Sequence, residues 1–505
     1  MKKLRCKICG REEVVENTSP EYHCPVCCAG IEYVESVDPA NPFDQVEELE
    51  PESPVRVETY QETEEEDNRV RIDPDNPAIM RIMEKCIQCG NCKRTCENVV
   101  GIHYNQKQCK HAVCIHCGQC ALSCPRGAIV PKYAYHHVRE AIKNKHKVVI
   151  ISTAPAVRVA LGEEFGMEPG TFVEGKMVKA LKKLGFDYVL DVTFGADLTI
   201  MEEAAELVDR IQHHELLPQF TSCCPSWVKY VEMYYPDLLP YLSTCKSPIA
   251  MQGSIIKSYF AQIHGIDPDN IVNVALTPCT AKKYECTRKE LNYTDRFKDT
   301  DYVITTSELA LWLRENKIDF KQLPEANYDS LLERGSGAGL IFGSTGGVME
   351  AALRTVHKIL TGQNPTDQLL QLKAVRGLTN VKEAEVTIQD TTLKVAVIHG
   401  IPNVIPFLEQ LKQGTLAYDF IEVMNCRGGC LGGGGQPLVP IQKEEQVRQA
   451  RMDSMYQQDE FDSLRCCHDN EDIRRLYEYY LEEPLSPNAE RFLHTFYESK
   501  KDLLK

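Results

Sequence analysis

Short apolar runs recur from about residue 147 onward and predict buried β-strands. These runs span residues 148–151, 188–190, 271–276, 303–305 and 395–398, and are rich in valine and isoleucine. Helical stretches such as 201–213 separate them. Strands that are apolar along their whole length and alternate with helices are typical of parallel sheets covered on both faces. The pattern therefore predicts an α/β domain with largely parallel sheets.

Composition narrows the class of protein. The chain has 505 residues and a formal charge of −16, and its lysines and arginines are scattered, which argues against a nucleic-acid partner. We expect no membrane span because no apolar stretch reaches about 18 residues. A charged start and an early Cys-x2-Cys leave no room for a signal segment, so a cytoplasmic protein is expected. In that compartment the 23 cysteines favour metal ligands over disulfides.

Two cysteine runs predict a pair of 4Fe-4S clusters. Cys86-x2-Cys89-x2-Cys92-x3-Cys96 is followed by Cys114-x2-Cys117-x2-Cys120-x3-Cys124-Pro125. In such a doubled run three cysteines bind one cluster and the fourth binds the other. We therefore expect Cys86, Cys89, Cys92 and Cys124 to hold one 4Fe-4S cluster, and Cys114, Cys117, Cys120 and Cys96 the second. Two zinc sites are a poor explanation for two runs in which each fourth cysteine binds the other cluster.

The first 36 residues carry a separate pair of cysteine motifs, Cys6-x2-Cys9 and Cys24-x2-Cys27. A segment this short needs a metal to hold its fold. It resembles a rubredoxin-like module. Its four thiolates suit iron or zinc, and the redox-rich neighbours favour iron.

These patterns divide the chain into four parts. We expect a metal module at 1–36, an acidic linker at 37–76, an α+β bacterial-ferredoxin-like domain at 77–140 and a two-lobed α/β catalytic domain at 141–505. A plain tether is the simpler interpretation of the linker, and docking of an electron partner is the alternative.

Three segments of the last domain carry the candidate chemistry. They are Thr221-Ser222-Cys223-Cys224-Pro225, Thr277-Pro278-Cys279-Thr280-Ala281-Lys282 and Met424-Asn425-Cys426-Arg427-Gly428-Gly429-Cys430, which leads into Gly432 to Gly435. Cys279 and Cys426 each follow a predicted strand, where parallel sheets collect their chemistry. Together the segments resemble the three signatures of FeFe-hydrogenases. The resemblance covers residues from about 80 to the end of the chain and implies interconversion of protons and electrons with dihydrogen.

The same resemblance implies a six-iron cofactor. Cys224, Cys279, Cys426 and Cys430 would hold its 4Fe-4S cubane. Cys430 would also bridge to a diiron unit that carries carbon monoxide, cyanide and an azadithiolate. The positions matching the diiron pocket are Ala154, Pro155, Ser247, Lys282, Phe342, Gly343 and Met424. A lysine ammonium in a closed pocket can pair with a cyanide ligand. The glycine run lacks the following lysine of a phosphate loop, so we expect its backbone to approach the metal.

A proton relay also follows from the resemblance. Cys223 matches the proton donor, and a thiol can give and take a proton near neutral pH. The matching relay is Glu203, Ser243, Glu206 and Arg210. Three of these lie at i, i+3 and i+7 of a predicted helix, so they share one face.

Three hypotheses of function remain at this stage. The first is an active hydrogenase that exchanges electrons with a ferredoxin-like carrier and obtains its diiron unit from maturation proteins. A dihydrogen sensor is the second, but Cys223 is present and no signalling domain is evident. The third is a nonenzymatic iron–sulfur assembly protein, against which Cys223, Lys282, Met424 and the glycine run argue. No role is predicted for Cys28, Cys109, Cys245, Cys286, Cys466 and Cys467.

Overall fold

The computed structural model describes residues 2–6, 12–15, 34–36, 68–102, 109–329 and 334–505. The amino-terminal part of this set is a three-stranded antiparallel sheet of β1 (Lys2–Cys6), β2 (Glu12–Val15) and β3 (Val34–Ser36), in the order β2-β1-β3. Cys9, Cys24 and Cys27 lie outside the described residues, so the metal site of this module stays a prediction.

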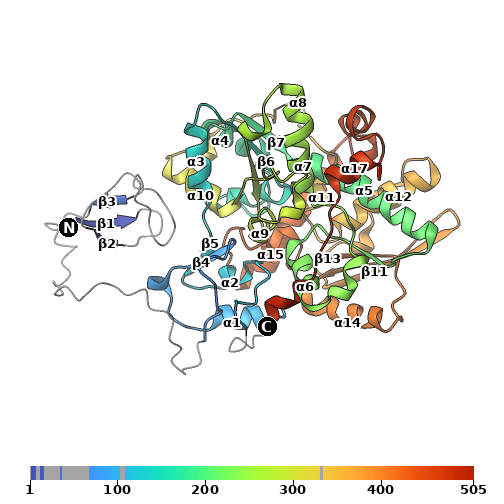
Figure 1. The fold of residues 1–505 in the computed structure, drawn as a ribbon, viewed down its shortest axis with the longest axis horizontal. Helices are drawn as coiled ribbons and strands as arrows, with labels where there is room; N and C mark the ends of the chain where they lie inside the picture. Colours follow the sequence, from blue (N-terminus) through green and yellow to red (C-terminus); the bar gives the residue numbers. More distant parts are fainter. Residues whose placement is uncertain (1, 7–11, 16–33, 37–67, 103–108, 330–333) are drawn as a thin grey trace.

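The ferredoxin-like domain is small and built around its cysteine runs (blue in Figure 1). It contains β4 (Ile79–Arg81), α1 (Asn91–Asn98), α2 (Gln119–Leu122) and β5 (Ile129–Pro131), and β4 pairs antiparallel with β5. The predicted linker differs from the structure at its end. Val70 is only 3% exposed and the Arg71 guanidinium donates to the backbone oxygens of Cys109 and Lys110, so residues 70–76 pack with this domain.

The catalytic part contains two four-stranded sheets, and the strands are largely parallel, as the apolar runs indicate. One has the order β10-β9-β6-β7 and is wholly parallel; the other has the order β11-β12-β13-β8, in which only the β11–β12 hairpin is antiparallel. The strands of the first sheet are β6 (Val148–Thr153), β7 (Tyr188–Asp191), β9 (Ile271–Thr277) and β10 (Tyr302–Thr305). Those of the second are β8 (Gln219–Phe220), β11 (Val381–Ile388), β12 (Thr391–His399) and β13 (Phe420–Met424).

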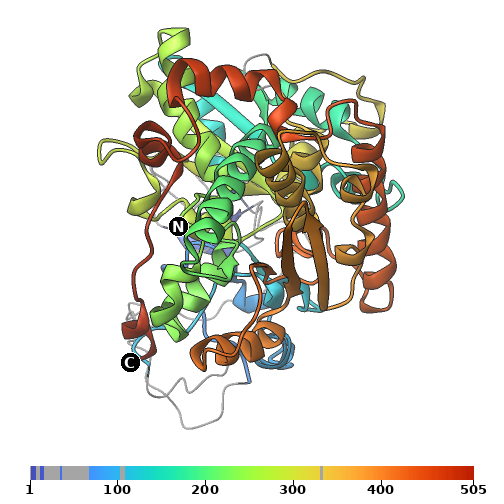
Figure 2. The same ribbon diagram turned by 90° about the vertical axis from the view of Figure 1, so that its right-hand side faces the viewer.

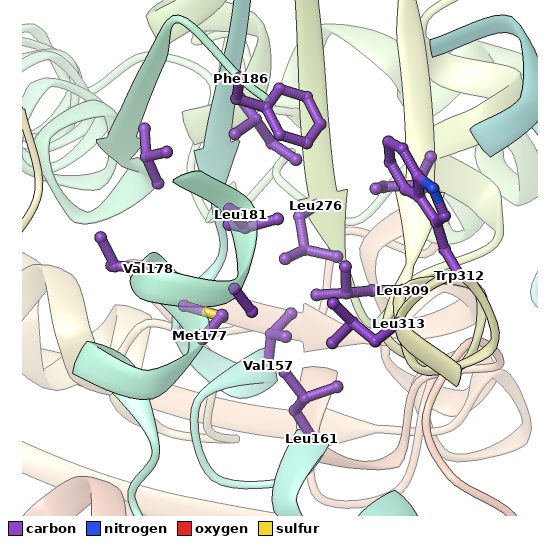
Figure 3. Packing of buried hydrophobic residues seen from close by; sticks show 14 of the residues in the cluster. Val157, Leu161, Met177, Val178, Leu181, Phe186, Leu276, Leu309, Trp312 and Leu313 are labelled. Carbon is purple, nitrogen blue, oxygen red and sulfur yellow. The ribbon is translucent and has the colours of Figure 1, made fainter. Parts of the chain in front are cut away.

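Helices cover both faces of the first sheet. One face packs against α3 (Tyr135–Lys143), α4 (Glu174–Leu184) and α10 (Thr306–Glu315). Figure 3 shows this core, in which Leu276 of β9 meets Leu181 of α4 and Leu309 of α10. The opposite face packs against α7 (Pro248–Ile255), α8 (Ala261–His264), α16 (Glu471–Leu476) and α17 (Pro487–Leu493). Burial on both faces explains why these strands are apolar throughout.

The second sheet is covered in the same way. Its two faces pack against α6 (Pro225–Tyr234) with α14 (Ile401–Lys412), and against α5 (Val192–His213) with α12 (Gly347–Thr361). Its β11–β12 hairpin forms the long brown arrows of Figure 2. The remaining helices are α9 (Ala281–Glu285), α11 (Gly337–Ile341), α13 (Asp367–Leu370) and α15 (Glu444–Phe461).

Helix α5 is longer than the apolar pattern predicts. The pattern places a helix at 201–213, but α5 begins at Val192, where the Asp191 side chain accepts a hydrogen bond from the Thr193 amide and caps the first turn. Its first turns are buried on all sides and carry little helical periodicity, which is why the pattern missed them. Nowhere in the described ranges is a helix long and apolar enough to cross a membrane.

Candidate active site and metal centres

The ends of three strands bring four cysteines together. Cys224 caps α6 shortly after β8, Cys279 follows β9 by two residues, and Cys426 follows β13 by two residues, with Cys430 in the same loop. All four residues line one cavity. The cavity therefore lies at the carboxyl ends of strands from both sheets, where parallel strands of this type place their sites.

The thiols of this cavity fit an iron–sulfur cluster. Burial raises the pKa of all four thiols, and charges on neighbouring cysteines raise it further for Cys279, Cys426 and Cys430; the pKa of Cys279 rises to about 11. Four thiols held this close and dry ionise readily only when a cation binds them, because the cation offsets both burial and mutual repulsion. Cysteine thiolates are the usual ligands of 4Fe-4S clusters.

The rest of the cavity wall is largely apolar. The positions predicted from the diiron pocket that line it are Ala154, Pro155, Lys282, Phe342, Gly343 and Met424. Ser247 is the exception: it lies next to the lining residue Pro248, at the cap of α7, and its buried hydroxyl has no hydrogen-bond partner in the part of the chain that the structure describes. The Asn425 side-chain oxygen, in a residue that lines the cavity, is unpaired among the same residues. An apolar cavity with such unpaired polar atoms fits the diiron unit with its small diatomic ligands.

Lys282 is the charged group of this wall. Its ammonium donates to the backbone oxygen of Cys223 at 3.1 Å and pairs with Glu285 Oε2 at 2.7 Å. Burial alone would lower the pKa of Lys282, but the Glu285 carboxylate raises it above its usual value. The side chain therefore stays positively charged inside the cavity, as a partner for an anionic ligand must.

The predicted relay residues are hydrogen-bonded to one another only from Ser243 to Arg210, because both carboxylate oxygens of Glu203 are buried without a hydrogen-bond partner among the described residues. Cys223 lines the cavity, while Glu203, Glu206 and Arg210 share one face of α5. Glu206 accepts hydrogen bonds from Ser243 Oγ at 2.6 Å and from Arg210 Nη2 at 2.7 Å. Burial and the neighbouring Glu206 carboxylate raise the pKa of Glu203 to about 8. Burial and the charge of Glu203 raise the pKa of the Cys223 thiol.

The two cysteine runs have the same backbone conformation. Gln88 and Gly90 have φ of +53° and +76°, and the matching His116 and Gly118 have +61° and +70°. Cys86, Cys89, Cys92 and Cys124 line a common pocket, which is the first expected ligand set. Burial raises the pKa of the Cys120 thiol, and charges on Cys117, Cys114, Cys96 and Cys92 raise it further, so the other three members of the second expected set lie near Cys120, as does Cys92 of the first set.

The glycine run reaches the cavity, which Gly433 lines, and it also lies in tight contact with neighbouring backbones. A Cβ atom on Gly433 would lie 2.5 Å from the Pro278 oxygen, and one on Gly434 would lie 2.4 Å from the Cys117 oxygen. The glycines are therefore required where three backbones cross, at the contact between the ferredoxin-like and catalytic domains. Gln119 strengthens this contact by donating to Cys426 Sγ at 3.3 Å and to the Gly432 oxygen at 2.9 Å.

Some residues of the site escaped the sequence analysis. Gln119, Asn425 and Glu285 carry no pattern of their own, although an amide side chain at the position before the third cysteine of both runs, Asn91 and Gln119, is a usable signal. Arg451 of α15 was also missed. It donates to the Leu431 oxygen at 2.6 Å and so fixes the loop after Cys430. The cysteines without a predicted role form no disulfide among the described residues, and Cys28 lies outside them.

Comparisons with known proteins agree with this geometry. Residues 147–434 match the C-terminal domain of the iron-only hydrogenase large subunit, residues 445–500 match the iron hydrogenase small subunit, and residues 111–130 match a 4Fe-4S binding domain. The small-subunit match spans α15, α16 and α17, so both subunit types are represented in one chain.

Relatives and solved structures point the same way. The chain is 42% identical to the NADP-reducing hydrogenase subunit HndD of Solidesulfovibrio fructosivorans, over 84% of this chain and 75% of the relative. It is 40% identical to iron hydrogenase 1 of Clostridium pasteurianum, over 82% and 74%. A solved [FeFe]-hydrogenase of Chlamydomonas reinhardtii is 39% identical with a TM-score of 0.64, covering 72% of this chain and 99% of that one. The chain therefore belongs to the family of iron-only, or FeFe, hydrogenases, enzymes that interconvert protons and electrons with dihydrogen at a six-iron cluster.

Proposed function

We propose that this hydrogenase exchanges electrons with a ferredoxin-like carrier through two 4Fe-4S clusters, and protons with solvent through Cys223 and the Glu203 relay. One observation carries the proposal: Cys223, Lys282 and the four cysteines expected to hold the cubane line one cavity. The cubane would be held by Cys224, Cys279, Cys426 and Cys430, and Cys430 would also hold the diiron unit. When bound there, the six-iron cluster supplies an open iron at which dihydrogen is formed or split.

The cavity residues would bind and orient that cofactor. The Lys282 ammonium, kept charged by Glu285, would pair with a cyanide ligand. The unpaired Ser247 hydroxyl has a free donor for a second polar ligand. Phe342 and Met424 exclude water, since both are buried in the cavity wall at 6% and 2% exposure. Water exclusion strengthens the ion pair made by Lys282.

Protons would move along the chain's own side chains. The Cys223 thiol holds its proton because burial raises its pKa, so it can donate that proton into the cavity. Glu203 is neutral below about pH 8 and can replace the proton on Cys223. The Ser243 hydroxyl already donates to Glu206, which is the next acceptor, and Arg210 pairs with Glu206 on the side away from the cavity.

Electrons would enter at the first cysteine run and leave at the second. Cys89 is exposed, and Arg69, Arg81 and Arg126 line the pocket of the first run. A positive rim of this kind favours an acidic electron carrier by charge complementarity. Cys114, Cys117, Cys120 and Cys96 would hold the second cluster, and the hydrogen bond from Gln119 to Cys426 Sγ would link that region to the cubane site.

The remaining parts of the proposal rest on the sequence. Cys6, Cys9, Cys24 and Cys27 would bind one iron, with zinc as the alternative. We further propose a cytoplasmic protein whose diiron unit is inserted by maturation proteins. A dihydrogen sensor and an iron–sulfur assembly factor are less consistent with the complete set of Cys223, Lys282 and Met424 around the cavity. One relative, 31% identical, is cytosolic iron-sulfur assembly component 3 of Mus musculus.

The proposal is tested by infrared spectroscopy of the maturated protein under dihydrogen, together with turnover. We expect carbonyl and cyanide stretching bands and steady dihydrogen exchange. Cys223→Ala should retain the bands and lose at least about 100-fold in turnover, because general acid catalysis contributes on the order of 10²–10⁴-fold. Cys286→Ala is the control, since Cys286 does not line the cavity. Missing bands exclude the enzyme; bands with negligible turnover in the unmodified chain favour the sensor.

The relay has its own test. Glu203 loses its proton above about pH 8, so dihydrogen evolution should fall above that pH. Glu203→Gln cannot pass a proton on and should evolve dihydrogen slowly at every pH, with normal infrared bands. A Glu203→Gln variant that keeps the original pH profile would contradict the relay.

A further inference from the structure

The turn between α15 and α16 carries a group of metal-binding side chains outside the catalytic cavity. Cys466 Sγ, a ring nitrogen of His468 and a carboxylate oxygen of Asp469 all lie within 4.8 Å of one another. Cys466 and His468 are buried, at 4% and 9% exposure, and Asp469 is exposed. Thiolate, imidazole and carboxylate are the three ligand types that Zn²⁺ accepts, and three protein ligands leave a fourth position for water.

The environment of His468 supplies a second, independent observation. Its Nδ1 atom contacts Thr355 Oγ1 at 3.2 Å, while its Nε2 atom is buried without a hydrogen-bond partner among the described residues. Buried polar atoms are normally paired, so an unpaired ring nitrogen in a buried turn indicates a missing partner. A histidine that ligates a metal typically has its other nitrogen held by a neighbouring polar group, as Thr355 holds Nδ1 here.

Metal binding at these residues balances without any other reactant. A divalent ion would displace the proton of the Cys466 thiol: the S–H bond breaks, a sulfur–metal bond forms, and one proton is released to solvent.

We propose that Cys466, His468 and Asp469 form a site for one Zn²⁺ ion, with water completing its coordination on the exposed side of Asp469. The site differs from the cluster sites in its mixed sulfur, nitrogen and oxygen donors, which suit zinc better than a 4Fe-4S cluster. Cys467, between two of the ligands, belongs to the buried cluster that contains Cys223. The ion therefore fixes a turn whose other side packs behind the catalytic cavity.

The test uses the full-length holoprotein, with its iron–sulfur clusters assembled and its thiols kept reduced. Co²⁺ serves as a spectroscopic probe for Zn²⁺, because a cysteine thiolate bound to it gives an intense charge-transfer absorption. The unmodified protein should bind one equivalent of Co²⁺ more than Cys466→Ser and more than His468→Gln. Zn²⁺ should displace it. Any Co²⁺ bound by the amino-terminal cysteines is the same in the unmodified protein and in every variant, so it does not affect the difference in bound equivalents between them. Cys286→Ser is the matched thiol control and should retain the extra equivalent.

Asp469→Asn keeps the test decisive if the buried variants fail to fold. Asp469 is exposed, so the change preserves the shape of the turn, and we expect at least a tenfold weaker affinity for Co²⁺ and Zn²⁺. Cluster absorption and dihydrogen turnover should remain unchanged, as evidence of folding. Equal cobalt stoichiometry and charge-transfer absorption in the unmodified protein, Cys466→Ser and His468→Gln would overturn the site, as would an unchanged affinity in Asp469→Asn.

Discussion

The two cysteine runs of the ferredoxin-like domain share a local conformation and differ in their surroundings. Both turn through two residues with positive φ at matching positions. In the first run Ile87 is 60% exposed and Cys89 is exposed. In the second run the equivalent Ile115 is 2% exposed and Cys117 is buried, in a core shared with the second sheet of the catalytic domain.

This difference teaches that the motif sets which atoms bind a cluster, while the surroundings set what the cluster is connected to. The first run faces solvent beside arginines that line its pocket. The second run contacts Thr280 and Gly434 of the catalytic domain. The Thr280 hydroxyl donates to the His116 backbone oxygen at 2.8 Å. One motif therefore serves both an exposed site and a buried junction.

The largest effect is expected from filling the junction. A Cβ on Gly118 would lie 2.4 Å from Thr280 Oγ1, whereas the nearest atom to a Cβ on Gly90 is 3.4 Å away. Both glycines have positive φ, so the strain of an alanine is common to both. Gly118→Ala should lose at least about tenfold in turnover and cost about 1–3 kcal/mol more than Gly90→Ala, the usual cost of overpacking. Thermal melting measures the stability of the two variants, and dihydrogen evolution measures their turnover. Equal losses of stability and turnover in Gly118→Ala and Gly90→Ala would show that the junction tolerates the methyl group.

The next effect concerns the two isoleucines. Ile115→Ala should destabilise the protein by about 2–5 kcal/mol, because the side chain leaves a cavity in the shared core. Ile87→Ala should change stability by less than about 0.5 kcal/mol, since its side chain is largely in solvent. Urea unfolding of both variants, followed by cluster absorption, provides the comparison. Similar midpoints would contradict the difference in burial.

The charged rim of the first run should matter for the carrier alone. Arg126→Glu should raise the KM for a reduced acidic ferredoxin by about tenfold at low salt and much less at high salt, because screening weakens exposed charges. Turnover with a small uncharged electron donor should be unchanged. Arg475→Glu, at an exposed arginine of α16, is the matched control. An unchanged KM in Arg126→Glu would show that the carrier does not dock at the first cysteine run.

The smallest effect is expected at the paired amides. Gln119→Leu removes the hydrogen bond to Cys426, which stabilises negative charge on the sulfur. Loss of about 0.5–1.5 kcal/mol should lower the one-electron potential of the cubane by roughly 20–60 mV. Asn91→Leu, at the same position of the first run, should leave that potential unchanged. Redox titration followed by infrared and electron paramagnetic resonance spectroscopy measures the potential of the cubane. Equal potentials in the unmodified protein and both variants would show that the Gln119 hydrogen bond does not influence the cubane.

Much of the fold was predictable because its signals are local. The strands β6 and β9 and the second half of β12 contain apolar runs, and such runs reveal burial on both faces without knowledge of partners. The start of α5 and the packed residues 70–76 were not predicted, because their burial comes from segments distant in the chain.

The sequence by itself determined the chemistry of this protein: the spacing of its cysteine runs and three signature segments indicated clusters and a hydrogenase. Only the tertiary structure decided the connections among them. It brought Cys224, Cys279, Cys426 and Cys430 to one cavity, and set Gln119 against Cys426. It also placed Gly434 of the glycine run against the backbone of Cys117. The physical reason is that a ligand motif depends on a few adjacent dihedral angles, whereas a contact between segments depends on how whole sheets and domains pack.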